Sequence, residues 1–527
     1  MPRPTVIARW PRFLAASAVL LTGATLAAQS PGFSDPQRLA KLSSSFADID
    51  RVFSAFAERE HIPGAVWGIV IDGKLAHVGV TGYRDVASKS PVDSGTVFRI
   101  ASMTKSFTAL AILKLRDEGK LSLDDLAERW VPELKGLKYP TSDSPRITIR
   151  HLMSHATGFP EDNPWGDQQL AVTDEEMSRM MRAGIPFSNA PGVAYEYSNY
   201  GFAILGRIVT KASGVPYRRY ISENILRPLG MTSTTLEPRE VPPGRIAQGY
   251  RWEDEQWKLE PQLPDGAFGS MGGMLTSTRD LGRYVGMFLD AWPPRDGPEA
   301  GAVKRSSLRE MQQIHRPRPP LVARGGNGAL QLYAGGYGYG LGISSDCNFA
   351  HIVAHSGGLP GFGSLMRWLP EYGVGIIAFG NRTYTGWGGP SNEAMGILMK
   401  TGGLVARMPE PSPILVARRE AVSRLVMRWD DRLADSLAAV NLFLDRSRDR
   451  RKAEISSLLG EVGACQAGRG FDVVENALRG QWTMPCERGS LRVSITLAPT
   501  MPPTVQFFEV SRAPATPQPP RGLCPAS

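Results

Sequence analysis

Hydrophobic residues recur with two different periods in the first part of the chain. Over Asp35–Arg59 they fall at helical spacing, which predicts an amphipathic helix. Two mainly apolar runs follow, Ala65–Ile71 and Leu75–Val80, and the pair Asp72-Gly73 between them is typical of a tight hairpin turn. We therefore expect a helix followed by a β-hairpin.

The later pattern returns to helix and then to strands. Helical spacing runs over Ser102–Gly119, where the glycine supplies a left-handed helix end. Short helices then alternate with Gly/Pro-rich loops such as Pro317–Gly328. Three apolar runs, Phe349–His355, Gly363–Leu369 and Val374–Phe379, predict successive strands. This order favours an α+β fold, in which one antiparallel sheet is built from both ends of the domain and flanked by helices.

Composition divides the chain into segments. We expect a signal peptide at 1–28, a main domain at 35–405, a linker at 406–414, a C-terminal accessory domain at 415–512 and a proline-rich, disordered tail at 513–527. Pro409, Pro411 and Pro413 mark the linker. In the accessory domain, Leu415–Leu444 predicts one long amphipathic helix and Val473–Val510 predicts antiparallel strands, so this small domain is also expected to be α+β.

The first 28 residues have the composition of an export signal. Three arginines precede an apolar run, which ends in small residues suited to signal peptidase. The run is too short for a comfortable membrane span, so we expect no stable span in the mature chain, with a retained N-terminal anchor as the alternative. Export places the protein in the periplasm or outside the cell, where Cys465 and Cys486 can form a disulfide.

Charge and metal-ligand spacing exclude several partners. The formal net charge is +9, but positive residues are spread out and interleaved with acidic ones, so no nucleic-acid partner is expected. No Cys-x-x-Cys spacing exists. The pairs His151/His155 and His351/His355 lack an evident third ligand, so we expect no metal and no cofactor.

The first chemical motif is Ser102-Met103-Thr104-Lys105 at the start of a predicted helix. Residues three apart on a helix share a face, so the Lys105 amine can reach the Ser102 hydroxyl. A lysine with a lowered pKa can take the proton of that hydroxyl and activate it as a nucleophile. Ser-x-x-Lys alone is a weak signal, because a surface turn can carry it by chance.

Two further motifs supply polar groups of the same kind. Tyr197 with a lowered pKa can act as a base, and Asn199 can hydrogen-bond a substrate carbonyl. A buried tyrosine and a helix-capping asparagine would explain this pair equally well. At the end of a predicted strand, His355 can meet a substrate carboxylate or polarise Tyr197, and the amides near Gly357 and Gly358 can face an oxyanion.

In this order and spacing, Ser102-x-x-Lys105, Tyr197-x-Asn199 and His355-x-Gly357 resemble the three active-site motifs of the class C β-lactamase-related serine hydrolases, which include penicillin-binding proteins, D,D-peptidases and esterases. Residues 147–158 and 272–278 are also similar to loops of this family. The resemblance covers about residues 45 to 400. It implies a β-lactamase/transpeptidase-like fold, in which the flanked antiparallel sheet is joined by an all-helical subdomain.

The resemblance also implies a role for each residue. Ser102 would attack the substrate carbonyl and become acylated, while Lys105 and Tyr197 would move protons. Asn199 would orient the substrate, and the backbone amides of Ser102 and Gly358 would form the oxyanion hole. These positions, with His355 and Gly357, are the expected catalytic and substrate-binding residues.

His355 departs from the lysine that most class C β-lactamases carry at this position. An imidazole, with an ordinary pKa of about 6.5, cannot hold a carboxylate as a permanent ammonium does. We therefore expect an exported hydrolase of an ester or amide, with D-alanyl peptides, D-amino-acid amides and β-lactams among the candidates. We also expect its activity to change in the pH region of histidine titration. A true β-lactamase is the alternative.

Two other classes of protein fit the sequence less well. Ala354–Gly358 mimics the nucleophile elbow of an α/β-hydrolase, but that fold needs a catalytic histidine after the serine and His355 is the last histidine. A non-catalytic exported protein that binds a cell-wall ligand would not need Ser102, Lys105 and Tyr197 together. The sequence leaves open the substrate, the role of the C-terminal region and the oligomeric state.

Overall fold

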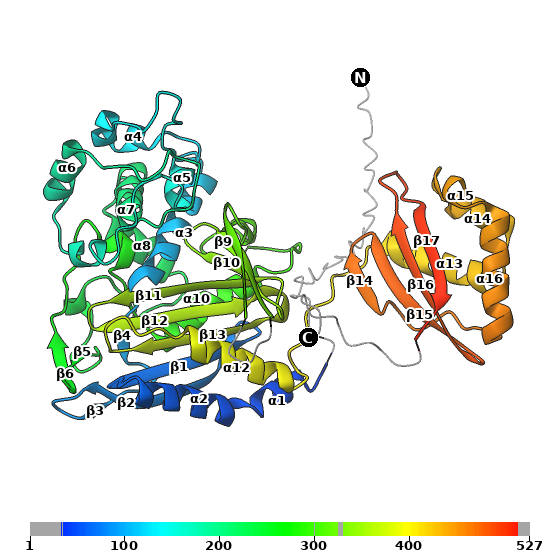
Figure 1. The fold of residues 1–527 in the computed structure, drawn as a ribbon, viewed down its shortest axis with the longest axis horizontal. Helices are drawn as coiled ribbons and strands as arrows, with labels where there is room; N and C mark the ends of the chain where they lie inside the picture. The colour runs from blue at the N-terminus through cyan, green and yellow to red at the C-terminus, as the bar shows by residue number, and fades with distance from the viewer. Residues whose placement is uncertain (1–32, 34, 300, 325–329, 515–527) are drawn as a thin grey trace, which may run out of the picture.

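The early hairpin and the late meander meet in one antiparallel sheet (Figure 1). The computed structural model describes residues 33, 35–299, 301–324 and 330–514, so the predicted signal peptide and almost all of the predicted tail lie outside the described residues. The strands of the sheet are β1 (Gly64–Ile71), β2 (Lys74–Asp85), β3 (Ser90–Pro91), β8 (Arg316–Arg324), β9 (Leu330–Tyr337), β10 (Gly342–Ser345), β11 (Ile352–Leu359), β12 (Phe362–Leu369) and β13 (Val374–Gly380). Their order across the sheet is β3-β2-β1-β13-β12-β11-β10-β9-β8. The predicted α+β class and the sheet built from both ends of the domain are confirmed.

Two local predictions in this sheet are wrong. The predicted strand Phe349–His355 is shifted, because β11 runs over Ile352–Leu359 and places His355 inside the strand. The predicted loop Pro317–Gly328 is largely strand β8. β8 lies at the edge of the sheet, and an edge strand tolerates prolines because one side of it needs no ladder hydrogen bonds.

Helices cover both faces of the sheet. On one face lie α1 (Arg38–Ser43), α2 (Phe46–Arg59) and α12 (Gly388–Lys400), whose apolar side chains share a core with β1, β12 and β13. The single helix predicted over 35–59 is broken at Ser44 and Ser45, which separate α1 from α2. On the other face lies α10 (Thr278–Asp290), which packs against α3 (Thr104–Asp117) through the stacked rings of Phe107 and Tyr284. Because both faces are covered, β1 is buried throughout.

A helical region adjoins the sheet, as the family resemblance implied (Figure 1). Its helices are α4 (Ala127–Trp130), α5 (Ile149–Met153), α6 (Asp174–Ala183), α7 (Asn199–Ser213) and α8 (Tyr217–Ile221). Smaller elements complete the domain that contains the sheet and the helical region: β4 (Val97–Arg99), β5 (Gly249–Glu253), β6 (Gln256–Glu260), α9 (Gly269–Gly272), β7 (Leu275–Ser277) and α11 (Arg305–Met311). Helices α3 and α7, which begin at the first and second motifs, pack against each other and against α9.

The C-terminal region forms a second α+β unit with its own core (Figure 1). It consists of α13 (Pro413–Met427), α14 (Asp431–Leu437), α15 (Leu442–Asp445), α16 (Arg448–Val462), β14 (Val473–Asn476), β15 (Arg479–Cys486), β16 (Gly489–Leu497) and β17 (Val505–Arg512). The long helix predicted over 415–444 is wrong, because Asp430 caps a new helix with its side chain and three shorter helices result. The predicted antiparallel strands form a four-stranded sheet.

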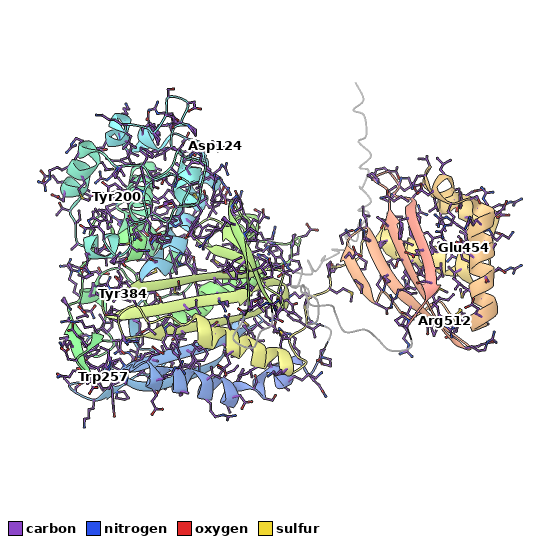
Figure 2. All side chains as sticks on the ribbon, viewed as in Figure 1. Asp124, Tyr200, Trp257, Tyr384, Glu454 and Arg512 are labelled. Atoms are coloured by element: carbon purple, nitrogen blue, oxygen red, sulfur yellow. A yellow bond between two sulfur atoms is a disulfide. The ribbon has the colours of Figure 1, made fainter. Side chains whose placement is uncertain are left out.

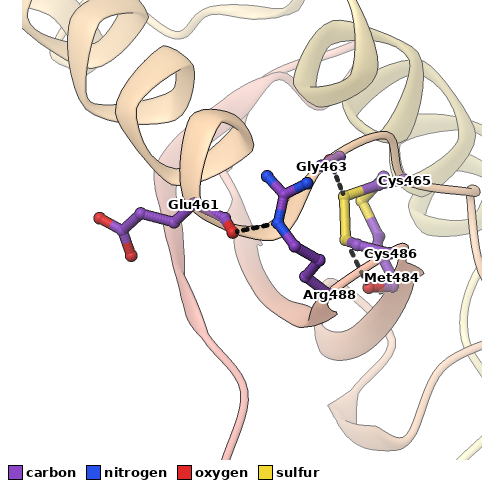
Figure 3. Close-up of a disulfide and its surroundings, with 6 residues drawn as sticks. All are labelled: Glu461, Gly463, Cys465, Met484, Cys486 and Arg488. Atoms are coloured by element: carbon purple, nitrogen blue, oxygen red, sulfur yellow. Dashed lines mark hydrogen bonds between the residues drawn. A yellow bond between two sulfur atoms is a disulfide. The ribbon is translucent and has the colours of Figure 1, made fainter.

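A disulfide joins Cys465 to Cys486, as predicted (Figure 3). It connects the segment after α16 to the end of β15, and beside it Arg488 Nε donates a hydrogen bond of 3.1 Å to the carbonyl oxygen of Glu461. None of the helices among the described residues has the length and apolarity needed to cross a membrane.

Candidate active site

Ser102 lies in a strained turn between β4 and α3. Residues Ala101–Met103 form a 3-10 turn, and Ala101 has a left-handed φ of 49° although it carries a Cβ. Such a conformation costs an ordinary residue about 1–2 kcal/mol. The neighbouring strand helps to hold it, because Ser364 Oγ donates a hydrogen bond of 2.8 Å to the Ile100 carbonyl oxygen.

Lys105 contacts Ser102 as the motif spacing predicts. Its Nζ donates a hydrogen bond of 3.0 Å to Ser102 Oγ, and two further bonds go to Asn199 Oδ1 at 2.6 Å and to the Met271 carbonyl oxygen at 2.9 Å. Burial lowers the pKa of Lys105 to about 7, although nearby acidic groups, Asp167 first, act to raise it. The predicted lowered pKa is confirmed, and near neutral pH a large fraction of Lys105 is an unprotonated amine.

Tyr197 does not have the lowered pKa that the sequence led us to expect. Burial raises its pKa well above the ordinary value of 10, although a hydrogen bond with Ser102 acts in the opposite direction. Its ring lies 4.3 Å from the ring of His155 and 4.8 Å from Lys105 Nζ, measured to the ring centroid. At neutral pH Tyr197 is therefore a phenol, which can relay a proton but does not begin as the base.

Asn199 is placed to hold Lys105 rather than to face a substrate. It is fully buried at the start of α7, and its side-chain nitrogen donates to Asn163 Oδ1 at 2.6 Å while its oxygen accepts from Lys105. Both ends of the amide are therefore engaged. Asn163, one step further out, lines the adjoining cavity instead.

His355 is a neutral residue in this structure. Its Nδ1 lies 2.6 Å from the Ser356 carbonyl oxygen, which can only accept, so Nδ1 carries the hydrogen and Nε2 accepts from the Tyr337 hydroxyl at 2.9 Å. Burial, followed by the charge of Lys105, lowers the pKa of His355 to about 3. His355 therefore does not titrate in the pH region where the sequence led us to expect a change in activity.

The two glycines of the third motif have different surroundings. A Cβ on Gly357 would lie 2.1 Å from the Ile100 carbonyl oxygen, so its absence lets β11 approach the segment that leads into Ser102. Gly358 borders the cavity, where a Cβ would lie 2.6 Å from Tyr384 Cδ1. An oxyanion hole at the Ser102 and Gly358 amides stays a prediction.

A cavity of about 480 Å³ opens over Ser102. It is lined by Ser102, Asn163, Pro164, Asp167, Tyr197, His355, Ser356, Gly358 and Tyr384. No lysine or arginine is among these lining residues. Among all the residues that the structure describes, no group of three or more His, Cys, Asp or Glu side chains is placed to hold a metal ion.

The part of the chain that contains this site matches a known protein family. The family model described as Beta-lactamase matches residues 49–394, a range that contains all three motifs. The chain belongs to the beta-lactamase family. The resemblance drawn from the motifs is thereby confirmed.

Curated relatives of the beta-lactamase family include Protein flp of Staphylococcus aureus (strain COL), 31% identical over 344 residues, which cover 64% of this chain and 64% of that protein. Penicillin-binding protein 4* of Bacillus subtilis (strain 168) is 29% identical over 353 residues, which cover 63% of this chain and 71% of the relative. The chain thus matches slightly less than two thirds of the length of Protein flp. The solved structure of the octameric penicillin-binding protein homologue from Pyrococcus abyssi shares the fold, with a TM-score of 0.57 at 24% identity, and covers 86% of this chain and 96% of its own.

The family motifs did not reveal every side chain at the cavity. Asn163, Pro164 and Asp167 come from the loop between α5 and α6, and Tyr384 comes from the loop after β13. Figure 2 labels Tyr384 near the boundary between the sheet and the helical region. Loop residues carry no hydrophobic period, so nothing in the sequence pattern singled them out.

Asp167 and Tyr384 form a polar contact in the cavity wall. The Tyr384 hydroxyl donates a hydrogen bond of 3.0 Å to Asp167 Oδ2, while Asp167 Oδ1 has no hydrogen-bond partner among the described residues. Asp167 is only 2% exposed. Burial raises its pKa to about 6, although Lys105 acts to lower it.

Proposed function

We propose that this protein is an exported serine hydrolase that cleaves an ester or amide through an acyl-enzyme on Ser102. The observation that carries the proposal is the contact between Ser102 Oγ and the buried Lys105 Nζ, whose pKa of about 7 supplies a free amine near neutral pH. Membership of the beta-lactamase family supports it, since Ser102 and Lys105 lie within the matched residues.

In the proposed acylation, Ser102 Oγ attacks the substrate carbonyl carbon and the Ser102 hydroxyl proton passes to neutral Lys105. The oxyanion that forms is stabilised by the backbone amides of Ser102 and Gly358. As the carbonyl carbon loses its bond to the leaving group, the Tyr197 hydroxyl gives its proton to that group and regains one from Lys105. The serine proton thus ends on the leaving group.

Deacylation follows the same route in reverse. Water attacks the acyl carbon and gives one proton to Lys105, which returns it to Ser102 Oγ as the ester bond breaks. The carboxylic acid product leaves and the resting hydroxyl is restored. Asn199 takes part by holding Lys105 Nζ at 2.6 Å, close to both Ser102 and Tyr197.

The test of the nucleophile compares two cavity serines. Ser102→Ala is expected to lower turnover of a 4-nitrophenyl ester about a millionfold and to abolish covalent labelling by a fluorophosphonate probe. Ser356→Ala is the control, since Ser356 lines the same cavity and would be the nucleophile of an elbow-type hydrolase. Labelling lost in Ser356→Ala and kept in Ser102→Ala would reject the proposal. A wild-type protein that is never labelled would favour a ligand-binding protein.

A true β-lactamase is the second candidate, because the family name and the relatives point to penicillin-type substrates. Against it, His355 is neutral and no cationic side chain lines the cavity to meet the carboxylate that penicillins and cephalosporins carry. We expect kcat/KM for a short-chain 4-nitrophenyl ester to exceed that for a chromogenic cephalosporin. A much higher value for the cephalosporin would show that this protein is a β-lactamase proper.

A further inference from the structure

The charges around the cavity do not balance in the state that is proposed to react. Catalysis requires Lys105 as the neutral amine, and in that state Asp167 loses the positive charge that most strongly opposes the effect of burial on its pKa. His355 is neutral, and no lysine or arginine lines the cavity. In that state Asp167 is a buried carboxyl group in the cavity wall with no cationic residue beside it in the lining and with one oxygen that has no hydrogen-bond partner among the described residues. A buried carboxylate without a counter-charge is unfavourable, so a cationic ligand group that binds beside it would gain favourable electrostatic free energy.

The neighbouring Asp162 differs from Asp167, because both of its carboxylate oxygens accept hydrogen bonds within the protein. Asp162 Oδ1 accepts from the backbone N–H of Asn199 at 2.7 Å and Oδ2 from that of Tyr200 at 2.8 Å, so both oxygens cap the start of α7. Asp167 has one such bond, from Tyr384, and its second oxygen has no partner among the described residues. Asp162 has a structural role, whereas Asp167 retains capacity for a ligand.

We propose that Asp167 and Tyr384 form an ammonium subsite, so that the hydrolase prefers acyl compounds with a protonated amine close to the scissile carbonyl. Amino-acid amides, amino-acid esters and peptides with a free amino terminus belong to this class. Asp167 supplies the negative charge, and the Tyr384 hydroxyl, which donates to Asp167, keeps oxygen lone pairs that can accept from the ammonium group. The inference rests on the proposed function, because it assigns the substrate class of the same site.

Competition with a neutral substrate tests the subsite directly. 4-Nitrophenyl acetate reports turnover, and alanine amide and isobutyramide compete for the site as a matched pair, one with an ammonium group where the other has a methyl group. Near neutral pH we expect the better enantiomer of alanine amide to inhibit about tenfold or more tightly than isobutyramide, as one charge-assisted hydrogen bond allows. In Asp167→Asn the two inhibition constants are expected to converge. Asp143→Asn, an exposed aspartate outside the cavity, is the matched control and keeps the difference.

The pH dependence adds a measurement that a purely structural role of Asp167 would not move. The groups that act on Asp167 are Lys105 on α3, Tyr384 after β13, and Asp162 and Glu161 on its own loop. Protonation of Asp167 removes the negative charge, so the advantage of alanine amide is expected to fall as the pH drops through about 6. Tyr384→Phe removes a hydrogen bond that lowers the pKa of Asp167, so it should move this midpoint to higher pH.

The outcomes separate the two proposals. If the wild-type protein does not hydrolyse 4-nitrophenyl acetate, or if Ser102→Ala still does, the proposed function fails and the subsite fails with it. If turnover depends on Ser102 but alanine amide binds no better than isobutyramide, or binds equally well in Asp167→Asn, the subsite alone is overturned. Should Asp167→Asn not fold, the wild-type and Tyr384→Phe pH profiles decide, since an advantage that does not change through pH 6 would overturn the subsite.

Discussion

Three ionisable side chains around Ser102 have pKa values that lie far apart. Burial lowers the pKa of Lys105 to about 7 and that of His355 to about 3, and it raises the pKa of Tyr197 well above 10. The same physical cause acts on all three, because a buried site disfavours whichever form of each group is charged. Near neutral pH Lys105 is thus the one of the three that changes protonation, and the pH dependence of acylation should follow it.

We expect the second-order rate of fluorophosphonate labelling to rise with pH through a midpoint near 7. Below that pH the Lys105 amine is protonated and cannot accept the Ser102 proton, so the rate falls on the acid side. Asp167→Asn should move the midpoint to lower pH, because Asp167 is the charge that most strongly raises the pKa of Lys105. Asp143→Asn is the control, and a profile that is flat from pH 5 to 9 would contradict the assignment of Lys105 as the base.

At the scale of the elements, the sequence predicts best where a local signal and the tertiary structure agree. Asp72 and Gly73 both adopt positive φ in the hairpin between β1 and β2, as their residue types indicate. Periodicity alone missed the breaks after α1 and after α13, where short polar side chains hydrogen-bond to nearby backbone groups and interrupt an otherwise continuous apolar pattern. It also missed β8, whose prolines are tolerated through its place at the sheet edge, which only the assembled sheet defines.

In the candidate site, too, some contacts follow from local sequence and others depend on the tertiary structure. Ser102 and Lys105 lie one helical turn apart, so their contact follows from sequence spacing. Asn199 was found by its motif, but its contact with Lys105 depends on the packing of α7 against α3. Asp167 and Tyr384 meet across a long sequence separation from two loops, and no local pattern could have paired them.

At the scale of the whole molecule, the C-terminal unit carries the disulfide, and the matched family range ends before that unit begins. Disulfides form and persist in oxidising compartments, which supports the proposal that the chain is exported to the periplasm or beyond. Closing a loop of this length contributes about 3 kcal/mol in the chain-entropy treatment, which is a large share of the stability of a small domain.

We expect intact mass measurement of protein recovered from the exported fraction to show a chain that begins near Gln29. Alkylation without reduction should leave Cys465 and Cys486 unmodified, and alkylation after reduction should modify both, because the two are joined. A mass that includes the first 28 residues would indicate a retained anchor. Free thiols at both positions in exported material would contradict the expected oxidising location.

The pairing of β1 with β13 has a consequence for the order of events during folding. Ala65 pairs with Gly380, so the centre of the sheet joins segments from opposite ends of the family domain, and such long-range pairing is slow to form. The turn that holds Ser102 is secured late as well, because Gly357 and Ser364 must first dock against Ile100. We therefore expect helix α3 to form before the turn at Ser102 is complete, and we expect the proposed nucleophile to become competent only after β11 and β12 have emerged.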